Sequence, residues 1–208
     1  GLRYFFANGF YSYSDAIALY SMIRTNKTKR IIEAGSGYSS ALMLDVNNLF
    51  FKNKIELTFI EPYPDRLYNL ISELDKSSTT IIESIIQDVP LEKFETLEAG
   101  DILFIDSTHV SKTGSDVNFI LFEVLPRLKS GVFIHFHDIF YPFEYPKSWV
   151  FNRQNWNEDY ILKAFLMYNK DFEIVFFSDY LHIHHAKAFN EMPLMKNNTG
   201  GNIWLKKN

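Results

Sequence analysis

The feature that most constrains the fold is an alternation of short, strand-like apolar segments with longer, helix-like segments along the first two-thirds of the chain. The strand-like segments lie at residues 29–33, 55–60, 79–83, 101–106 and 131–136. The spacing of apolar residues predicts helices at residues 14–24, 38–50, 65–74 and 115–128. Segment 101–106, DILFID, is apolar throughout its centre, which is typical of a strand with both faces covered. The alternation predicts an α/β fold with a doubly wound, mostly parallel sheet.

The pattern changes towards the C-terminus. A helix is predicted at residues 158–169, followed by strands at 172–177 and 202–206. No helix is evident between these last two strands, so we expect them to pair antiparallel at the end of the sheet. Neither a linker nor an internal repeat interrupts the sequence, and residues 1–208 are therefore predicted to form a single domain.

Composition excludes several classes of protein. Hydrophobic residues make up 47% and charged residues 22% of the chain, as in folded globular domains. The net charge of −4 disfavours a nucleic-acid partner, and no apolar run reaches the roughly 18 residues of a membrane-spanning helix. Without cysteine, the chain has no disulfides, thiolate nucleophiles or cysteine-bound metals. No secretory signal opens the chain, so the expected compartment is the cytoplasm.

A glycine-containing turn follows the first predicted strand and opens the next helix. In the motif EAGSGYSS, residues 33–40, Gly35 and Gly37 allow a tight turn and a close approach of backbone to a ligand. The helix that begins there offers free N–H groups. A dinucleotide fingerprint needs a third glycine near position 40, where Ser40 stands. The turn is interpreted as a ligand loop, with a plain strand-to-helix turn as the alternative.

Polar residues follow the next two strands as well. Glu61 ends the second strand, where a carboxylate can accept hydrogen bonds from both hydroxyls of a ribose. The alternative for Glu61 is an exposed strand-end residue. Gln87 and Asp88 lie beyond the third strand and carry groups that can bind the edge of an adenine, although a turn before Pro90 explains them equally well.

Two further strands end in acidic and histidine residues. Asp106 and His109 follow one strand, and His137 and Asp138 follow the next. Ligands of open parallel sheets bind beyond the carboxyl ends of the strands, so these side chains are expected to converge. Two close carboxylates repel each other unless a cation lies between them, and oxygen ligands favour Mg²⁺, Mn²⁺ or Ca²⁺. A nitrogen from His137 shifts this preference towards transition metals, and a histidine such as His109 suits a general base.

Three remaining features are interpreted more simply. The aromatic loop at residues 140–146 is expected to wall a substrate pocket or to act as a lid, with local packing as the alternative. The histidines at 182, 184 and 185 are interpreted as surface or substrate-loop residues. The aromatic N-terminal segment, residues 4–11, is expected to cover a cofactor or to pack on a partner.

Taken together, EAGSGYSS, FIEPYP, DILFIDSTH and GVFIHFHDIF resemble the motifs of class I S-adenosylmethionine-dependent methyltransferases. The resemblance runs from about residue 10 to the end of the chain. It implies a Rossmann-like, seven-stranded, mostly parallel sheet whose last strand pair is antiparallel. It also implies that S-adenosyl-L-methionine is the cofactor, held by Glu33, Gly35, Ser36, Gly37, Tyr38, Ser39, Glu61, Gln87, Asp88 and Asp106.

Within that superfamily the last two motifs resemble metal-dependent O-methyltransferases of the macrolide-sugar and catechol types. The resemblance implies that Asp106 binds Mg²⁺ or another divalent cation and that His109 is the base. Asp138 matches the second member of the acidic pair of the sugar enzymes, whereas His137 replaces the first. The predicted metal ligands are therefore Asp106, His137 and Asp138. The implied reaction is methyl transfer to a hydroxyl oxygen of a small molecule, such as a sugar or phenol.

The sequence leaves other functions open. A non-haem iron hydroxylase would use His135 or His137 together with Asp138 and another histidine. A nicotinamide-dependent dehydrogenase and a non-catalytic module that only binds the cofactor are further alternatives. The expected partner is a hydroxylated small molecule, with no nucleic acid and no membrane. A homo-oligomer is a further expectation, since the aromatic N-terminal segment could pack on a partner.

Overall fold

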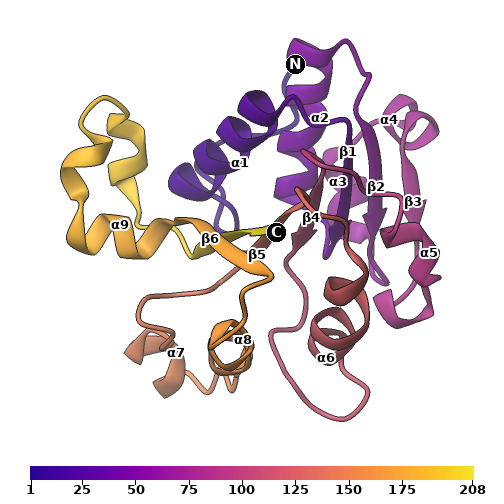
Figure 1. The fold of residues 1–208 in the computed structure, drawn as a ribbon. Helices are drawn as coiled ribbons and strands as arrows, with labels where there is room; N and C mark the ends of the chain where they lie inside the picture. The colour runs from indigo at the N-terminus through magenta and orange to yellow at the C-terminus, as the bar shows by residue number, and fades with distance from the viewer.

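The computed structural model describes all 208 residues, which form one seven-stranded sheet with helices on both faces (Figure 1). The strand order is β3-β2-β1-β4-β5-β7-β6. The strands are β1 (Arg30–Ala34), β2 (Glu56–Ile60), β3 (Thr80–Ile82), β4 (Ile102–Ile105), β5 (Phe133–His137), β6 (Phe172–Phe177) and β7 (Asn202–Lys207). The predicted Rossmann-like sheet is confirmed.

Strands β1 to β5 pair in parallel, so their carboxyl ends meet at one edge of the sheet. The register places Ala34 beside Ile105, and Ile105 beside Phe136. The residues that follow these strands therefore emerge side by side. Strand β7 runs antiparallel between β5 and β6, which confirms the predicted antiparallel pair at the end of the sheet.

Helices cover the two faces in two groups. They are α1 (Tyr13–Asn26), α2 (Tyr38–Phe51), α3 (Asp65–Leu70), α4 (Glu73–Ser78), α5 (Leu91–Phe94), α6 (Asp116–Phe119), α7 (Lys147–Phe151), α8 (Glu158–Leu166) and α9 (Ser178–His184). Alternate residues of β4 belong to different cores: Ile102 and Phe104 pack with α1, α2 and α3, whereas Leu103 and Ile105 pack with α5, α6 and α8. Both faces of β4 are thus buried, as the apolar run in its sequence predicts. None of the helices combines the length and hydropathy needed to cross a membrane.

Two predicted helices differ in the structure. The helix predicted at residues 65–74 is divided into α3 and α4, because Ile71 is extended and Ser72 caps α4. The backbone N–H of Ser72 donates to Asp75 Oδ2 at 2.8 Å, and Ser72 Oγ accepts from the Asp75 backbone N–H at 3.3 Å. The helix predicted at residues 115–128 is α-helical only in α6 and continues as a π-helical turn and a 3₁₀ turn. Pro126 has no N–H to sustain a regular helix there.

The expectation that no helix separates the last two strands is wrong, because α9 follows β6 directly. The segment between β6 and β7, residues 178–201, lies beside α1 and away from the centre of the sheet (Figure 1). Ser14 of α1 donates a hydrogen bond to the carbonyl oxygen of Met195 at 2.6 Å. The helix is short and rich in histidine, so its apolar residues do not show a helical period strong enough to identify it.

Candidate functional site

The turn after β1 brings the ends of β1 and β4 into contact. Gly35 has a φ of +85°, and a Cβ added there would lie 1.6 Å from the carbonyl oxygen of Asp106. The backbone N–H of Asp106 donates to the carbonyl oxygen of Ala34 at 2.8 Å. Only glycine therefore fits at position 35, and the absence of a side chain there fixes Asp106 against the turn.

Glu33 supports this turn from inside the protein. Ser39 donates to Glu33 Oε1 at 2.5 Å, Ser40 donates to Glu33 Oε2, and Ser40 Oγ accepts the backbone N–H of Gly37. Burial raises the pKa of Glu33 to about 8, although the serine hydroxyls oppose this shift. Glu33 lines neither of the cavities described next, so its predicted role in binding cofactor stays a prediction while its role in shaping the turn is visible.

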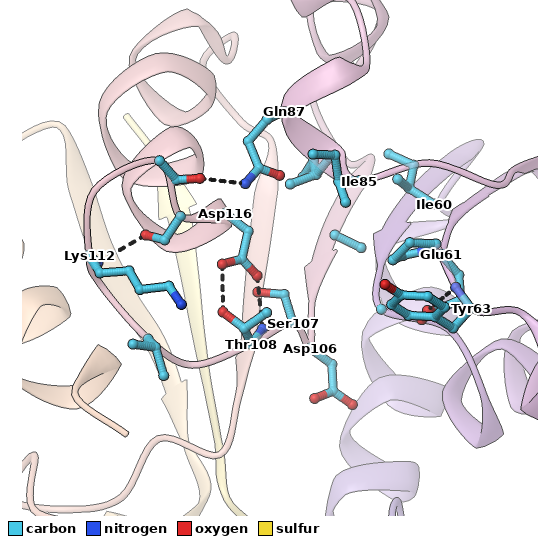
Figure 2. Close-up of a pocket in the computed structure, with 17 residues that line it drawn as sticks. Ile60, Glu61, Tyr63, Ile85, Gln87, Asp106, Ser107, Thr108, Lys112 and Asp116 are labelled. Carbon is cyan, nitrogen blue, oxygen red and sulfur yellow. Dashed lines mark hydrogen bonds between the residues drawn. The ribbon is translucent and has the colours of Figure 1, made fainter. Parts of the chain in front are cut away.

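Two adjoining cavities lie at the carboxyl edge of the sheet, and Figure 2 shows the residues that line the larger one. The larger has a volume of about 390 Å³, and the smaller has about 220 Å³. The two cavities share four residues, Gly35, Glu61, Asp106 and Ser107. The smaller is also lined by Ser36, Gly37, Tyr38 and Ser39 and is flanked by Phe10 and Arg66. Their sizes suit a small-molecule ligand.

Glu61 is fixed by two backbone hydrogen bonds. Its Oε2 accepts from the N–H of Ser36 at 3.0 Å, and its Oε1 accepts from the N–H of Tyr63 at 2.9 Å. Each carboxylate oxygen can accept a further hydrogen bond, so Glu61 can still bind two neighbouring hydroxyls of a ribose. The Glu61 carboxylate thus ties the turn after β1 to the turn after β2.

Gln87 and Asp88 lie in different environments. Gln87 Nε2 donates to the carbonyl oxygen of Gly114 at 2.9 Å, whereas Gln87 Oε1 is buried beside the larger cavity without a partner. Ser107 Oγ is likewise buried and unpartnered in the lining of both cavities. Asp88 is exposed and lines neither cavity. The unpartnered polar atoms and the apolar wall formed by Ile60, Ile85 and Ile86 fit an adenosyl group.

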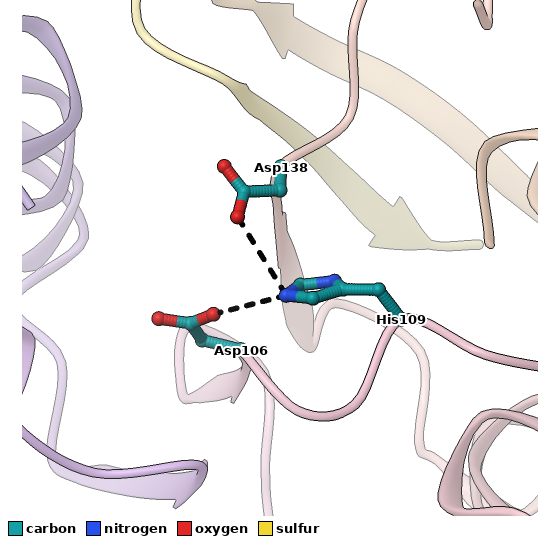
Figure 3. Close-up of side chains that lie close together, drawn as sticks. All are labelled: Asp106, His109 and Asp138. Atoms are coloured by element: carbon teal, nitrogen blue, oxygen red, sulfur yellow. Dashed lines mark ion pairs between the residues drawn. The ribbon is translucent and has the colours of Figure 1, made fainter. Parts of the chain in front are cut away.

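The side chains of Asp106, His109 and Asp138, all predicted site residues, lie close together beside the cavities (Figure 3). His109 Nε2 lies 3.4 Å from Asp106 Oδ1 and 3.6 Å from Asp138 Oδ2. One ligand atom from each of the three residues lies within 4.8 Å of the others, a spacing that can hold a metal ion. His109 and Asp138 both have positive φ values, 59° and 55°, so the backbone is strained on both sides of the cluster.

A buried carboxylate orients His109. His109 Nδ1 lies 2.8 Å from Glu158 Oε2, and the carbonyl oxygen of His109 accepts from the N–H groups of Asn157 and Glu158. Burial alone would lower the pKa of His109, but the neighbouring carboxylates of Asp106 and Glu158 raise it well above its ordinary value. Sequence reasoning missed Glu158, because only its place at the start of a predicted helix marked it.

His137 faces the same two carboxylates from the end of β5. Its Nδ1 lies 3.3 Å from Asp106 Oδ1 and 3.6 Å from Asp138 Oδ2, and it has no hydrogen-bond partner. Although burial opposes the shift, Asp138 and Asp106 raise the pKa of His137 to about 10. His137 and His109 in turn hold the pKa of Asp106 far below its ordinary value against the effect of burial. Burial raises the pKa of Asp138.

His135 does not join this cluster. It is fully buried within β5 and stacks on Phe104 with ring centroids 3.9 Å apart. Burial keeps its pKa well below the ordinary value, and neither ring nitrogen has a partner. The alternative iron site would use His135 or His137 as a ligand. Of these two, only His137 faces Asp138, at 3.6 Å.

Aromatic residues flank His109 on its outer side. The Trp156 ring lies 4.3 Å from the ring of His109, and Trp149 and Tyr145 contact Trp156 at centroid distances of 5.2 and 6.1 Å. Tyr145 belongs to the loop at residues 140–146, so this loop lies close to the cluster. The Tyr145 hydroxyl accepts a hydrogen bond from the backbone N–H of Asp159 at 3.2 Å.

The remaining predicted features lie elsewhere. His182 contacts Ser14 at 3.0 Å and stacks on Phe189, while His184 at the end of α9 and His185 just after it are exposed. The N-terminal segment covers the smaller cavity, since Phe10 stacks on Tyr38 with centroids 5.8 Å apart. His184 and His185 are therefore surface residues, whereas His182 packs between Ser14 and Phe189 and the N-terminal Phe10 lines the smaller cavity.

Comparison with known proteins agrees with this geometry. A family described as "Methyltransferase domain" matches residues 32–139, more than half of the chain. An uncharacterised protein of Archaeoglobus fulgidus is 41% identical over 99 residues, which cover 48% of this chain and only 44% of that relative.

Solved structures share the fold at low sequence identity. SAH-bound methyltransferase PaMTH1 of Podospora anserina has a TM-score of 0.56 at 19% identity, covering 93% of this chain and 77% of its own. The O-methyltransferase TomG of Streptomyces achromogenes, in complex with SAM, has a TM-score of 0.55 at 13% identity, with coverages of 92% and 78%. A CmcI structure with Mg and SAM has a TM-score of 0.54 at 16% identity, with coverages of 92% and 70%. The chain therefore belongs to the family described as "Methyltransferase domain" and shares the Rossmann-like fold of these solved methyltransferases.

Proposed function

We propose that this protein transfers a methyl group from S-adenosyl-L-methionine to a hydroxyl oxygen of a small molecule, such as a sugar or phenol. The observation that carries the proposal is the position of Asp106. This residue lines both cavities and also faces His109 Nε2 across 3.4 Å. A cofactor in the cavities and a base in the cluster would thus be neighbours.

The cavity lining supports the choice of cofactor. The backbone carbonyl oxygens of Gly35 and Ser36 would accept hydrogen bonds from its amino group. Glu61 would accept hydrogen bonds from the ribose hydroxyls, and Gln87 Oε1 would accept one from the adenine amino group. When bound, S-adenosylmethionine supplies an electrophilic methyl group attached to a sulfonium. The chain contributes orientation, which can account for a large part of the rate of a bimolecular transfer.

His109 would accept the proton of the substrate hydroxyl at Nε2. Its Nδ1–H donates to Glu158, so the contact of 2.8 Å keeps the ring fixed and directs Nε2 into the cluster. Asp106 and Asp138 would hold a divalent cation, whose charge lowers the pKa of a neighbouring hydroxyl or imidazole. The aromatic loop at residues 140–146 lies on the side of His109 from which an acceptor would enter.

Calorimetric titration tests the cofactor assignment. S-adenosylmethionine and S-adenosylhomocysteine are expected to bind, and NAD⁺ is not. Glu61→Ala should weaken binding at least about 10-fold, because the ribose loses charge-assisted hydrogen bonds. Glu123→Ala, an exposed glutamate outside both cavities, is the matched control. Absence of cofactor binding to the wild-type protein would refute the proposal.

A transfer assay tests the reaction. A panel of sugars and phenols with radiolabelled methyl donor should reveal product that disappears in His109→Ala. The same panel with 2-oxoglutarate and iron tests the hydroxylase alternative, because His109, His137 and Asp138 also bring two imidazoles and one carboxylate together. Full transfer activity in His109→Ala would exclude His109 as the base.

A further inference from the structure

The residue at position 137 changes the chemistry expected of the cation site. His137 is the last residue of β5, where the resemblance implies a carboxylate, and it is 5% exposed. Its Nδ1 points at Asp106 Oδ1 and Asp138 Oδ2 but forms no hydrogen bond with either. A buried nitrogen without a partner carries a free-energy cost unless something else occupies the space before it.

The distances within this group match those between ligands of one ion. Two ligand atoms about 2.1 Å from a common ion are about 3.0 Å apart at a right angle and about 3.4 Å apart at a tetrahedral angle. The Nδ1 of His137 lies 3.3 Å from one carboxylate oxygen and 3.6 Å from the other. Both distances from Nδ1 are therefore close to those between two ligands of one ion, with Asp106 following β4 and Asp138 following β5.

The opposite side of the His137 ring is also arranged as in a metal site. Its Nε2 faces Asp15 Oδ1 at 3.9 Å, and Asp15 is itself held by the N–H of Gly201 and by Asn202 Nδ2. Histidine ligands commonly have a carboxylate behind them, which fixes the ring and raises the basicity of the ligating nitrogen. The ring of Tyr11 lies 5.2 Å from that of His137 and limits its rotation.

We propose that His137, Asp106 and Asp138 form a mixed nitrogen–oxygen site that selects a transition-metal ion such as Mn²⁺, Co²⁺ or Zn²⁺ over Mg²⁺. Imidazole nitrogen suits first-row transition metals, whereas Mg²⁺ prefers an all-oxygen shell. This inference rests on the proposed function and names the ion that its site would take. His109 Nε2 lies at similar distances from the same two carboxylates, 3.4 and 3.6 Å, so an experimental test must distinguish the two histidines. We keep His109 as the base because Glu158 fixes its other nitrogen.

Metal selectivity tests the proposal without an acceptor. Metal-free protein is titrated calorimetrically with Mg²⁺ and with Co²⁺, and the ratio of the two affinities is compared with that of His137→Asp. Replacing the nitrogen by a carboxylate should lower the preference for Co²⁺ over Mg²⁺ at least about 10-fold. His184→Asp, on the exposed part of α9, is the matched control and should keep the wild-type ratio. An unchanged ratio in His137→Asp would overturn the proposal.

Pulsed EPR of the Mn²⁺-loaded protein provides a second test, which starts from the wild-type chain. Nitrogen hyperfine coupling from a directly bound imidazole is expected, and its absence would overturn the proposal. The coupling should persist in His109→Gln and disappear in His137→Gln, whereas the reverse pattern would overturn the assignment to His137.

Cofactor binding separates this inference from the proposed function. If the wild-type protein binds S-adenosylmethionine but shows neither nitrogen coupling nor a preference for Co²⁺, the metal inference fails and the methyltransferase proposal stands. If the protein binds transition metals as expected but not S-adenosylmethionine, the proposed function fails instead.

Discussion

Replacing Glu33 by glutamine should stabilise the protein at neutral pH. Glu33 is fully buried, and burial raises its pKa to about 8 from the ordinary value of 4.5. Between these two values the folded protein holds a proton that the unfolded chain releases. The contribution of Glu33 to stability is therefore fully present below about pH 4.5 and is lost as the pH rises towards 8.

The size of the effect follows from the two pKa values. A tenfold difference in proton affinity between the folded and unfolded states corresponds to about 1.4 kcal/mol, so the stability lost between pH 4.5 and pH 7 is about 3 kcal/mol. Glutamine is neutral at every pH and can keep both contacts: its oxygen accepts from Ser40, and its amide donates to the hydroxyl of Ser39. The free energy of unfolding of Glu33→Gln, relative to that of the wild-type protein, should therefore rise by about 3 kcal/mol between pH 4.5 and pH 7.

Urea denaturation of both proteins across pH 4.5 to about 8.5 measures this difference. Other titrating groups affect both proteins alike, so the difference curve isolates Glu33. Glu92→Gln, an exposed glutamate, should follow the wild-type curve throughout. Parallel curves for wild type and Glu33→Gln would refute the reasoning, because they would mean that Glu33 is ionised in the folded state.

Three further substitutions test the turn, the base and a helix cap. Gly35→Ala should cost about 3 kcal/mol or more and abolish binding of S-adenosylmethionine, because its Cβ would overlap the Asp106 carbonyl at 1.6 Å; a wild-type melting temperature would contradict this. Glu158→Gln should lower kcat for methyl transfer about 10- to 100-fold while leaving cofactor affinity unchanged in calorimetry, and an unaltered kcat would show that Glu158 does not position His109. Ser72→Ala should lower the free energy of unfolding by about 1 kcal/mol in a urea melt through loss of the cap of α4, and no loss would show that the cap is dispensable.

Residues at strand ends were predictable because the sheet is parallel. Once strands were identified before Glu61, Asp106 and Asp138, topology required their carboxyl ends to meet at one edge. Local sequence was enough for this step, since each strand carries its own apolar signal. The predicted positions of the cavity and of the cluster follow from that single fact.

The supporting carboxylates could not be found in the same way. Glu158 lies 49 positions from His109 and comes from α8. Asp15, which faces the His137 ring, comes from α1 near the start of the chain. Neither carboxylate follows a strand, and both depend on how helices pack over the sheet edge. Pairwise contacts between distant elements leave no period or motif in one sequence.

Asp106 links the cavities at the turn after β1 to the cluster formed with His109 and His137, so these two parts of the site are held together. Its backbone N–H is bonded to Ala34, its carbonyl oxygen fills the space that a side chain at Gly35 would need, and its carboxylate faces both His109 and His137. A shift of the turn that would hold the cofactor therefore moves the carboxylate that would hold the cation. Methyl transfer requires the donor carbon and the acceptor oxygen to be aligned within a fraction of an ångström, and a single residue bonded to both parts provides that alignment without a moving element.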